Sequence, residues 1–70
     1  MNRQIVISSE LKSVGYDHDT RMLEIDFHTG GIYQYADVPL NQFRQLMAAQ
    51  SKGRYFNRNI RTKYPCKRVT

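Results

Sequence analysis

The chain has 70 residues, of which 40% are hydrophobic and 24% are charged, and it carries a net charge of +5. This length allows one domain, and the balance is that of a globular protein, which excludes a disordered chain. No apolar run approaches the roughly 18 residues of a membrane helix, and the first residues enter a strand-like run without a signal-peptide core, so we expect a location in the cytoplasm.

The first part of the chain shows the period-two pattern of β-strands. Short β-branched or alternating runs at residues 5–7, 13–16, 22–27 and 32–35 predict strands. A polar turn cluster separates the second run from the third, and a Thr-Gly-Gly hairpin signal separates the third from the fourth. These segments predict an antiparallel meander with one face covered.

After Pro39 the pattern becomes helical. Pro39 suits the first turn of a helix, and an apolar stripe follows at positions i, i+3 and i+4 from Phe43. Residues 51–53 are predicted to end this helix and to cap a second one. In the second helix, Phe56 and Ile60 are four positions apart and point inward together.

The predicted fold class is therefore α+β: an antiparallel three- to four-stranded meander, followed by two short helices packed on one face. Residues 1–64 are expected to form this single domain. Because Pro65 stops regular structure, residues 65–70 are expected to form a basic C-terminal tail that frays.

Two tyrosines occupy the last predicted strand. Tyr33 and Tyr35 are two positions apart, so both point to one face of the sheet, and the length of the hairpin loop decides which face. A two-residue loop would place them on the other face of the sheet from the apolar side chains of the preceding strand. A three-residue loop at 28–30 would pair Ile25 with Tyr33 and bring both tyrosines to the core side. We favour the three-residue loop, because it gives one apolar and one polar face. Tyr33 and Tyr35 are then either members of the core or candidate residues for stacking on unpaired bases.

The charges divide the chain into two halves. Residues 1–37 hold all six acidic residues and three basic ones, a net charge of −3. Residues 38–70 hold eight basic residues and no acid, a net charge of +8. A domain built this way has one positive pole, which indicates a polyanionic or acidic partner unless the charges only serve solvation.

The basic half supplies the best site candidates. Arg54, Arg58 and Arg61 recur at helical spacing, and arginine forks suit phosphate oxygens. A structural alternative for Arg61 is an ion pair with Asp17 or Asp37. The candidate nucleic-acid-binding residues are Lys52, Arg54, Tyr55, Arg58, Arg61, Lys63, Lys67 and Arg68.

Motifs of enzymes and metal sites are absent from the sequence. The single cysteine, Cys66, excludes a disulfide framework and a zinc finger, and no phosphate loop or set of spaced metal ligands occurs. The run from Asp17 to Asp19 is typical of a turn, and Ser8 and Ser9 suit turn or cap roles. The sequence thus predicts no catalytic residue, no metal, no cofactor and no enzyme activity.

Several motifs follow one another in a fixed order: Ser8-Ser9, Gly15-Tyr16-Asp17, Gly30-Gly31-Ile32-Tyr33-Gln34-Tyr35, Val38-Pro39 and Ala49-x-Ser51-x-Gly53-x-Tyr55-Phe56-Asn57. In this order they resemble the KTSC domain family over about residues 5–64. That family comprises short bacterial and phage proteins and the C-terminal module of some lysyl-tRNA synthetases. The resemblance implies RNA binding through this association, and it carries over no catalytic residues. The Lys67-Arg68 end lies beyond the family pattern.

Taken together, these features predict a small non-catalytic module that binds nucleic acid, either RNA or single strands. The alternative is a protein-binding adaptor or inhibitor, of a kind that phages encode, whose basic surface docks on an acidic partner. Neither a membrane nor a small-molecule substrate is indicated, and the oligomeric state stays open.

Overall fold

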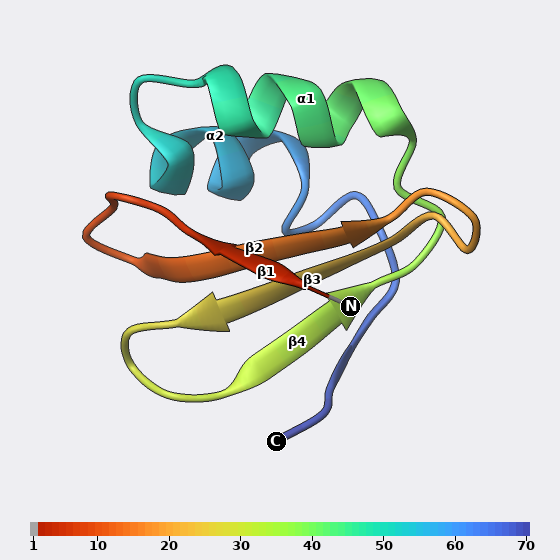
Figure 1. Cartoon of the computed structure of the whole chain (residues 1–70), viewed down its shortest axis with the longest axis horizontal. Coiled ribbons are helices and arrows are strands. Elements are labelled where there is room, and N and C mark those ends of the chain that lie inside the picture. Colours follow the sequence, from red (N-terminus) through yellow and green to blue (C-terminus); the bar gives the residue numbers. More distant parts are fainter. Residues whose placement is uncertain (1) are drawn as a thin grey trace.

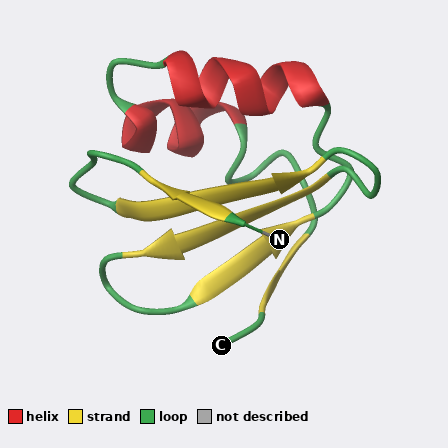
Figure 2. Cartoon of the chain, viewed as in Figure 1, coloured by secondary structure: helices red, strands yellow, loops and turns green. Residues whose placement is uncertain are grey.

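The computed structural model describes residues 2–70, in which five strands form one antiparallel sheet in chain order (Figure 1). The strands are β1 (Arg3–Ile5), β2 (Leu11–Asp17), β3 (Met22–Phe27), β4 (Ile32–Tyr35) and β5 (Cys66–Arg68). The helices α1 (Leu40–Ala48) and α2 (Lys52–Asn59) lie on one face of this sheet (Figure 2). The predicted α+β meander with two helices on one face is confirmed. No helix within residues 2–70 is long and apolar enough to cross a membrane.

The hairpin between β3 and β4 has the predicted three-residue loop. Ile25 lies opposite Tyr33 and Leu23 lies opposite Tyr35, which places both tyrosines on the helix-covered side. The loop closes through a hydrogen bond from the Phe27 N–H to the Gly31 carbonyl, 3.2 Å. Gly30 has a φ of 97°, a conformation that glycine adopts at little cost. The predicted register is therefore confirmed, and Leu23, Ile25, Tyr33 and Tyr35 share one face of the sheet.

The C-terminal end corrects the sequence prediction. Fraying after Pro65 was expected, and this expectation is wrong, because residues 66–68 form β5 and pair with β4. The Pro65 carbonyl accepts a hydrogen bond from the Ala36 N–H (2.9 Å), and the Val69 N–H donates to the Ile32 carbonyl (2.7 Å). Proline lacks a donor but keeps its acceptor, so it can begin an edge strand.

Both halves of the chain supply the core. Phe56 of α2 is 1% exposed, and its ring meets the rings of Phe27 and Tyr35 edge to face at 5.5 and 5.3 Å between centroids. Tyr16 of β2 stacks on Phe43 of α1 at 4.9 Å. The other fully buried apolar side chains are Leu11, Val14, Leu23, Ile25, Val38, Leu46 and Ile60.

The helix ends follow local capping chemistry. Pro39 is the N-cap of α1, immediately before the first helical residue, because its fixed φ suits a helix start. The Ser51 hydroxyl accepts a hydrogen bond from the Arg54 N–H (3.3 Å) and caps α2, as predicted. At the other end α2 stops at Asn59, and Ile60 has left the helical conformation. Arg61 therefore follows the helix and is not part of it.

The outer face of the sheet carries a polar network. Glu24 is 8% exposed and accepts hydrogen bonds from Gln34 (2.9 Å) and from Arg3, with which it also forms an ion pair. Burial would raise the pKa of the Glu24 carboxyl, but these hydrogen bonds and the Arg3 charge outweigh burial and lower it. The buried charge is thus held within the fold.

Candidate nucleic-acid interface

The basic residues of the C-terminal half meet no carboxylate. Among residues 2–70, the only ion pair that involves a lysine or arginine joins Arg3 to Glu24, in the N-terminal half. All eight basic residues within 38–70 are exposed except Lys52, which is half-buried. Their positive charge is therefore accessible to a ligand.

Two of the predicted arginines share a groove beside the helices. Arg54 and Arg58 are one turn apart on α2, and both line a shallow hollow of about 270 Å³ between the end of α1 and α2. We call it the helix groove. Its lining residues are Ala49, Gln50, Ser51, Arg54, Tyr55, Arg58 and Asn59. Lys52 lies near it and donates to the Ala49 carbonyl (3.2 Å).

Tyr55 lines the helix groove and also links α2 to α1 through its hydroxyl. Its hydroxyl lies within hydrogen-bond distance of the side-chain oxygens of Gln42 (2.5 Å) and Gln45 (3.0 Å) on α1, which share its one proton. Burial, with a smaller effect from Tyr64, raises the pKa of the Tyr55 hydroxyl. Tyr55 therefore joins the two helices and fixes the wall of the groove.

The structure separates Arg61 from the other two arginines. Its guanidinium lies over a second, larger hollow and donates to the Asn57 side-chain oxygen at 3.4 Å. Neither Asp17 nor Asp37 pairs with it, so the alternative ion pair is not formed. The prediction of one stripe of three arginines assumed that the helix continues past residue 60, but α2 ends at Asn59, two residues before Arg61.

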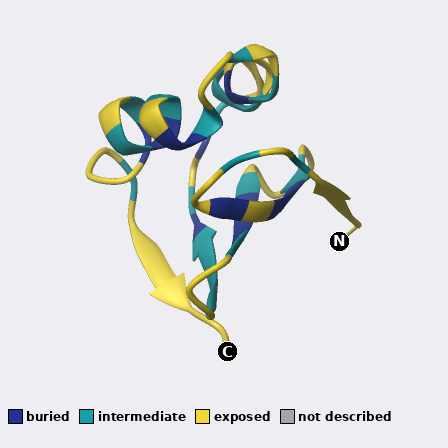
Figure 3. Ribbon diagram, turned by 90° about the vertical axis from the view of Figure 1, so that its left-hand side faces the viewer, coloured by how far each residue is buried: buried dark blue, intermediate teal, exposed yellow. Residues whose placement is uncertain are grey.

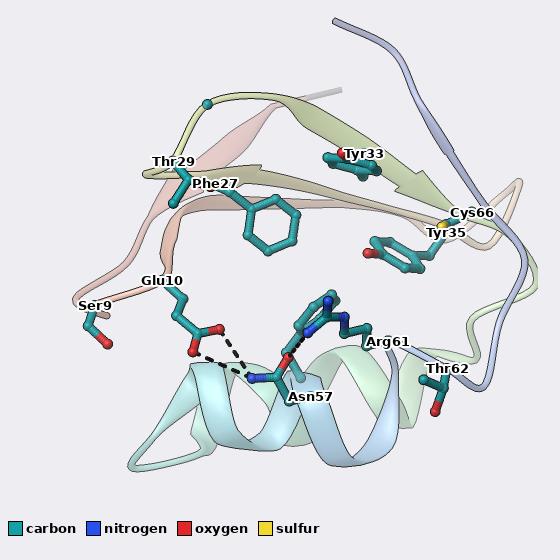
Figure 4. A pocket seen from close by; sticks show the side chains of 12 residues that line it. Ser9, Glu10, Phe27, Thr29, Tyr33, Tyr35, Asn57, Arg61, Thr62 and Cys66 are labelled. Atoms are coloured by element: carbon teal, nitrogen blue, oxygen red, sulfur yellow. Dashed lines mark hydrogen bonds between the residues drawn. The ribbon is translucent and has the colours of Figure 1, made fainter.

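The larger hollow lies between the sheet and α2 and has a volume of about 600 Å³ (Figure 4). We call it the aromatic cavity. Phe27, Tyr33, Tyr35 and Phe56 supply its rings. Its remaining lining residues are Ser9, Glu10, Thr29, Gly30, Asn57, Arg61, Thr62 and Cys66.

The two tyrosines of β4 belong to the core side and to this cavity. Tyr35 is 4% exposed, and its hydroxyl points into the cavity (Figure 4). Burial, together with the neighbouring Cys66 thiol, raises the pKa of the Tyr35 hydroxyl to about 12, so this hydroxyl keeps its proton at neutral pH. Tyr33 is half-buried, and the Arg68 guanidinium lies over its ring at 5.9 Å.

The basic residues of β5 point in two directions. Arg68 lies opposite Tyr33 and shares the helix side of the sheet with it, whereas Lys67 lies opposite Gln34 on the outer face. Lys63 is exposed in the turn between α2 and β5. Because neighbouring residues of a strand point to opposite faces of the sheet, Lys67 and Arg68 lie on different faces. The expectation of a frayed tail did not include this separation.

The residues that suggested turns form turns. The Asp17 carboxylate accepts from the Asp19 N–H (3.0 Å), and the Ser8 hydroxyl accepts from the amides of Glu10 and Leu11 (both 3.2 Å). Within residues 2–70, no group of three or more His, Cys, Asp or Glu side chains could hold a metal ion.

Sequence reasoning missed the polar rim of the aromatic cavity. Asn57 donates to the Glu10 carboxylate at 3.2 and 3.5 Å and accepts from Arg61, which gives a chain of three side chains. Glu10 and Asn57 are 47 positions apart, so no local spacing brings them together. Only the packing of α2 on the sheet does.

Comparison with known proteins agrees with this architecture. The sequence profile of the KTSC domain matches residues 7–64. The chain belongs to the KTSC domain family. The crystal structure of a KTSC domain protein from Yersinia pestis is similar with a TM-score of 0.96 at 46% identity, covering 99% of this chain and 97% of that one. The predicted family and fold are confirmed.

Relatives of this KTSC domain occur alone and within larger proteins. An uncharacterized protein from Stutzerimonas stutzeri is 42% identical over 57 residues, which cover 81% of this chain and 80% of that protein. A lysine–tRNA ligase from Trichormus variabilis is 38% identical over 56 residues, 80% of this chain but 10% of the ligase. The ligase shares only this domain.

Proposed function

We propose that this KTSC domain is a non-catalytic module that binds single-stranded nucleic acid, with RNA as the preferred class. One observation carries the proposal: seven of the eight basic residues within 38–70 are exposed, and none of the eight forms an ion pair with an acidic side chain in the described part of the chain. A phosphate backbone would neutralise them, and the release of its counterions would drive binding.

The arrangement of these residues suits a short strand. The exposed surfaces of α2, of the turn after it and of β5 run down one side of the molecule, toward the C-terminus (Figure 3). Along this side, which we call the basic path, lie Arg54 and Arg58 at the helix groove, then Arg61 at the rim of the aromatic cavity, Lys63 in the turn and Arg68 on β5. Lys67, on the outer face of the sheet, contributes to the general field and not to the path.

The kinship with lysine–tRNA ligases favours RNA over DNA, because tRNA is named in what those relatives act on. The path consists of cationic side chains that hold a backbone rather than read base edges. We therefore expect weak sequence preference and strong dependence on salt.

The test is a fluorescence anisotropy titration of a labelled decauridylate across a range of salt concentrations. If about four phosphates are contacted, the slope of log affinity against log salt is roughly −3 for a single strand. The double variant Arg54→Gln/Arg58→Gln should reduce that slope to about −1.5, because two contacts are lost. Lys12→Gln removes an exposed cation from the N-terminal half and should leave the slope unchanged.

Absence of salt-dependent binding at roughly 100 μM protein would contradict the proposal. The adaptor or inhibitor hypothesis predicts that result, together with a protein partner whose capture survives nuclease treatment. A slope that responds equally to Lys12→Gln and to the double variant would show that net charge alone, and not the path, attracts the strand.

A further inference from the structure

We propose that the aromatic cavity between β4 and α2 receives one unpaired nucleobase of the bound strand. This inference rests on the proposed function, since the basic path would hold the backbone while the cavity takes the base. It differs from base stacking on an open sheet surface, because the cavity lies on the helix side of the sheet and is enclosed by α2.

Phe27 and Tyr33 are half-buried and present ring surface to the cavity, whereas Phe56 and Tyr35, 1% and 4% exposed, form its floor. Phe27 meets Tyr33 edge to face at 5.6 Å and Phe56 at 5.5 Å, and Phe56 in turn meets Tyr35 at 5.3 Å. These mutually tilted rings leave open space between the sheet and α2 (Figure 4). The volume of about 600 Å³ lies within the range of small-ligand pockets. A base of any identity gains stacking contacts from the accessible ring surface of Phe27 and Tyr33.

The cavity rim presents both hydrogen-bond donors and acceptors. Arg61 has five N–H donors, and within residues 2–70 its one side-chain hydrogen bond is the 3.4 Å contact to Asn57. The Glu10 carboxylate offers acceptors on the other side of Asn57. The protonated Tyr35 hydroxyl adds a further donor inside the cavity. This mixture matches the edge of a nucleobase, which also carries donors and acceptors side by side.

The charge of the rim argues against a phosphate in the cavity. Glu10 is the one acidic residue among its lining residues, and Arg61, which also belongs to the basic path, is the one basic residue. A phosphate inside would meet the Glu10 carboxylate, whereas a phosphate on the path outside meets only cations. We therefore place the base in the aromatic cavity and the phosphates on the basic path outside it.

The basic path reaches the rim of the cavity at Arg61, and Ser9, Glu10, Thr29 and Gly30 form exposed rim elsewhere. Arg61 and Cys66 line the cavity and are exposed, and Lys63 lies in the turn between them. A backbone held by Arg58, Arg61 and Lys63 would therefore pass the cavity rim at Arg61. A single base could enter while its own phosphate stays outside.

The test compares two decamers that carry the same phosphates. One is decauridylate, and the other is built from stable abasic ribonucleotides, in which hydrogen replaces each base. We expect the wild-type domain to bind decauridylate about tenfold more tightly, since stacking of one base contributes that much, while both decamers give the same salt slope. Tyr35→Phe removes only the hydroxyl inside the cavity and should weaken decauridylate binding about threefold without affecting the abasic decamer. Tyr64→Phe is the matched control, because Tyr64 is half-buried and does not line the cavity.

Cys66 gives a direct readout at the cavity. It is the one cysteine of the chain, it is exposed, and it lines the cavity beside Tyr35. Saturating decauridylate should slow alkylation of Cys66 by iodoacetamide, whereas the saturating abasic decamer should not. Equal affinity for both decamers, with equal alkylation rates and an intact salt slope, would overturn the base cavity and leave the proposed function standing. If neither decamer binds, both proposals fail.

Discussion

In the N-terminal half of the chain, Glu24 is 8% exposed, and its carboxylate accepts hydrogen bonds from Arg3 and Gln34. In the C-terminal half, Arg54 and Arg58 are exposed and meet no carboxylate. The Arg3–Glu24 pair is thus satisfied within the fold, whereas no lysine or arginine within residues 38–70 forms an ion pair in the described part of the chain. Since the two halves bury apolar side chains alike, their difference lies in how they use charge.

The largest expected effect tests whether the basic half also builds the core. Phe56→Ala removes a ring that is 1% exposed and touches two other rings, so the free energy of unfolding should fall by about 3–5 kcal/mol. Arg58→Ala, on the same helix but exposed, should change it by less than about 0.5 kcal/mol. Urea unfolding followed by circular dichroism measures both. A large loss from Arg58→Ala would mean that the charges of this half are structural after all.

A smaller effect tests the internal charges of the sheet half. Arg3→Gln removes the cation beside Glu24 and should cost about 1–2 kcal/mol at pH 7, less than for a fully buried pair because Arg3 is 32% exposed. No comparable loss is expected for Lys12→Gln, since Lys12 has no such partner.

The contribution of the Glu24 carboxylate to stability should depend on pH. Because the folded-state pKa of Glu24 is lowered, the charged form stabilises the fold above the ordinary value of 4.5, and that stabilisation is lost as pH falls below it. Glu24→Gln should therefore flatten this part of the stability–pH profile, measured by thermal unfolding between about pH 6 and pH 3. An unchanged profile would show that the Glu24 network contributes nothing.

The smallest effect concerns the edge strand. Arg68→Ala removes the cation over the Tyr33 ring and should cost about 0.5–1 kcal/mol. Lys67→Ala, one position away on the outer face, should cost less. Amide hydrogen exchange of Val69, whose N–H donates to the Ile32 carbonyl, reports whether β5 loosens in either variant. Equal effects would contradict the division of β5 into two faces.

Local patterns in the sequence predicted the elements that depend on neighbours in the chain. The parity of the hairpin fixed the register of Tyr33 and Tyr35, and Ser51 marked the start of α2, because both depend on residues within a few positions. The strand β5 was missed since its partner, Tyr33, lies 35 positions from Arg68. Its own three residues show no pattern strong enough to predict a strand.

The candidate site was predicted only in part for the same reason. Counting charges along the sequence identified the basic half, because this count does not depend on the three-dimensional structure. The spacing of the arginines could not show that α2 ends at Asn59 and that Arg61 turns to a different hollow from Arg54 and Arg58. The aromatic cavity joins residues from opposite ends of the chain, such as Glu10 and Cys66, and no periodicity connects them.

The most direct measurement is an NMR titration of the ¹⁵N-labelled domain with decauridylate at low salt. If the second half carries the binding surface, amide shifts should move in α2, in residues 60–64 and in β5, while Ser13 and Glu24 on the outer face of β2 and β3 stay in place. Added salt should reverse the changes. Shifts confined to residues 2–37, or none at all, would contradict the claim that the unpaired charges of the second half serve a polyanionic ligand.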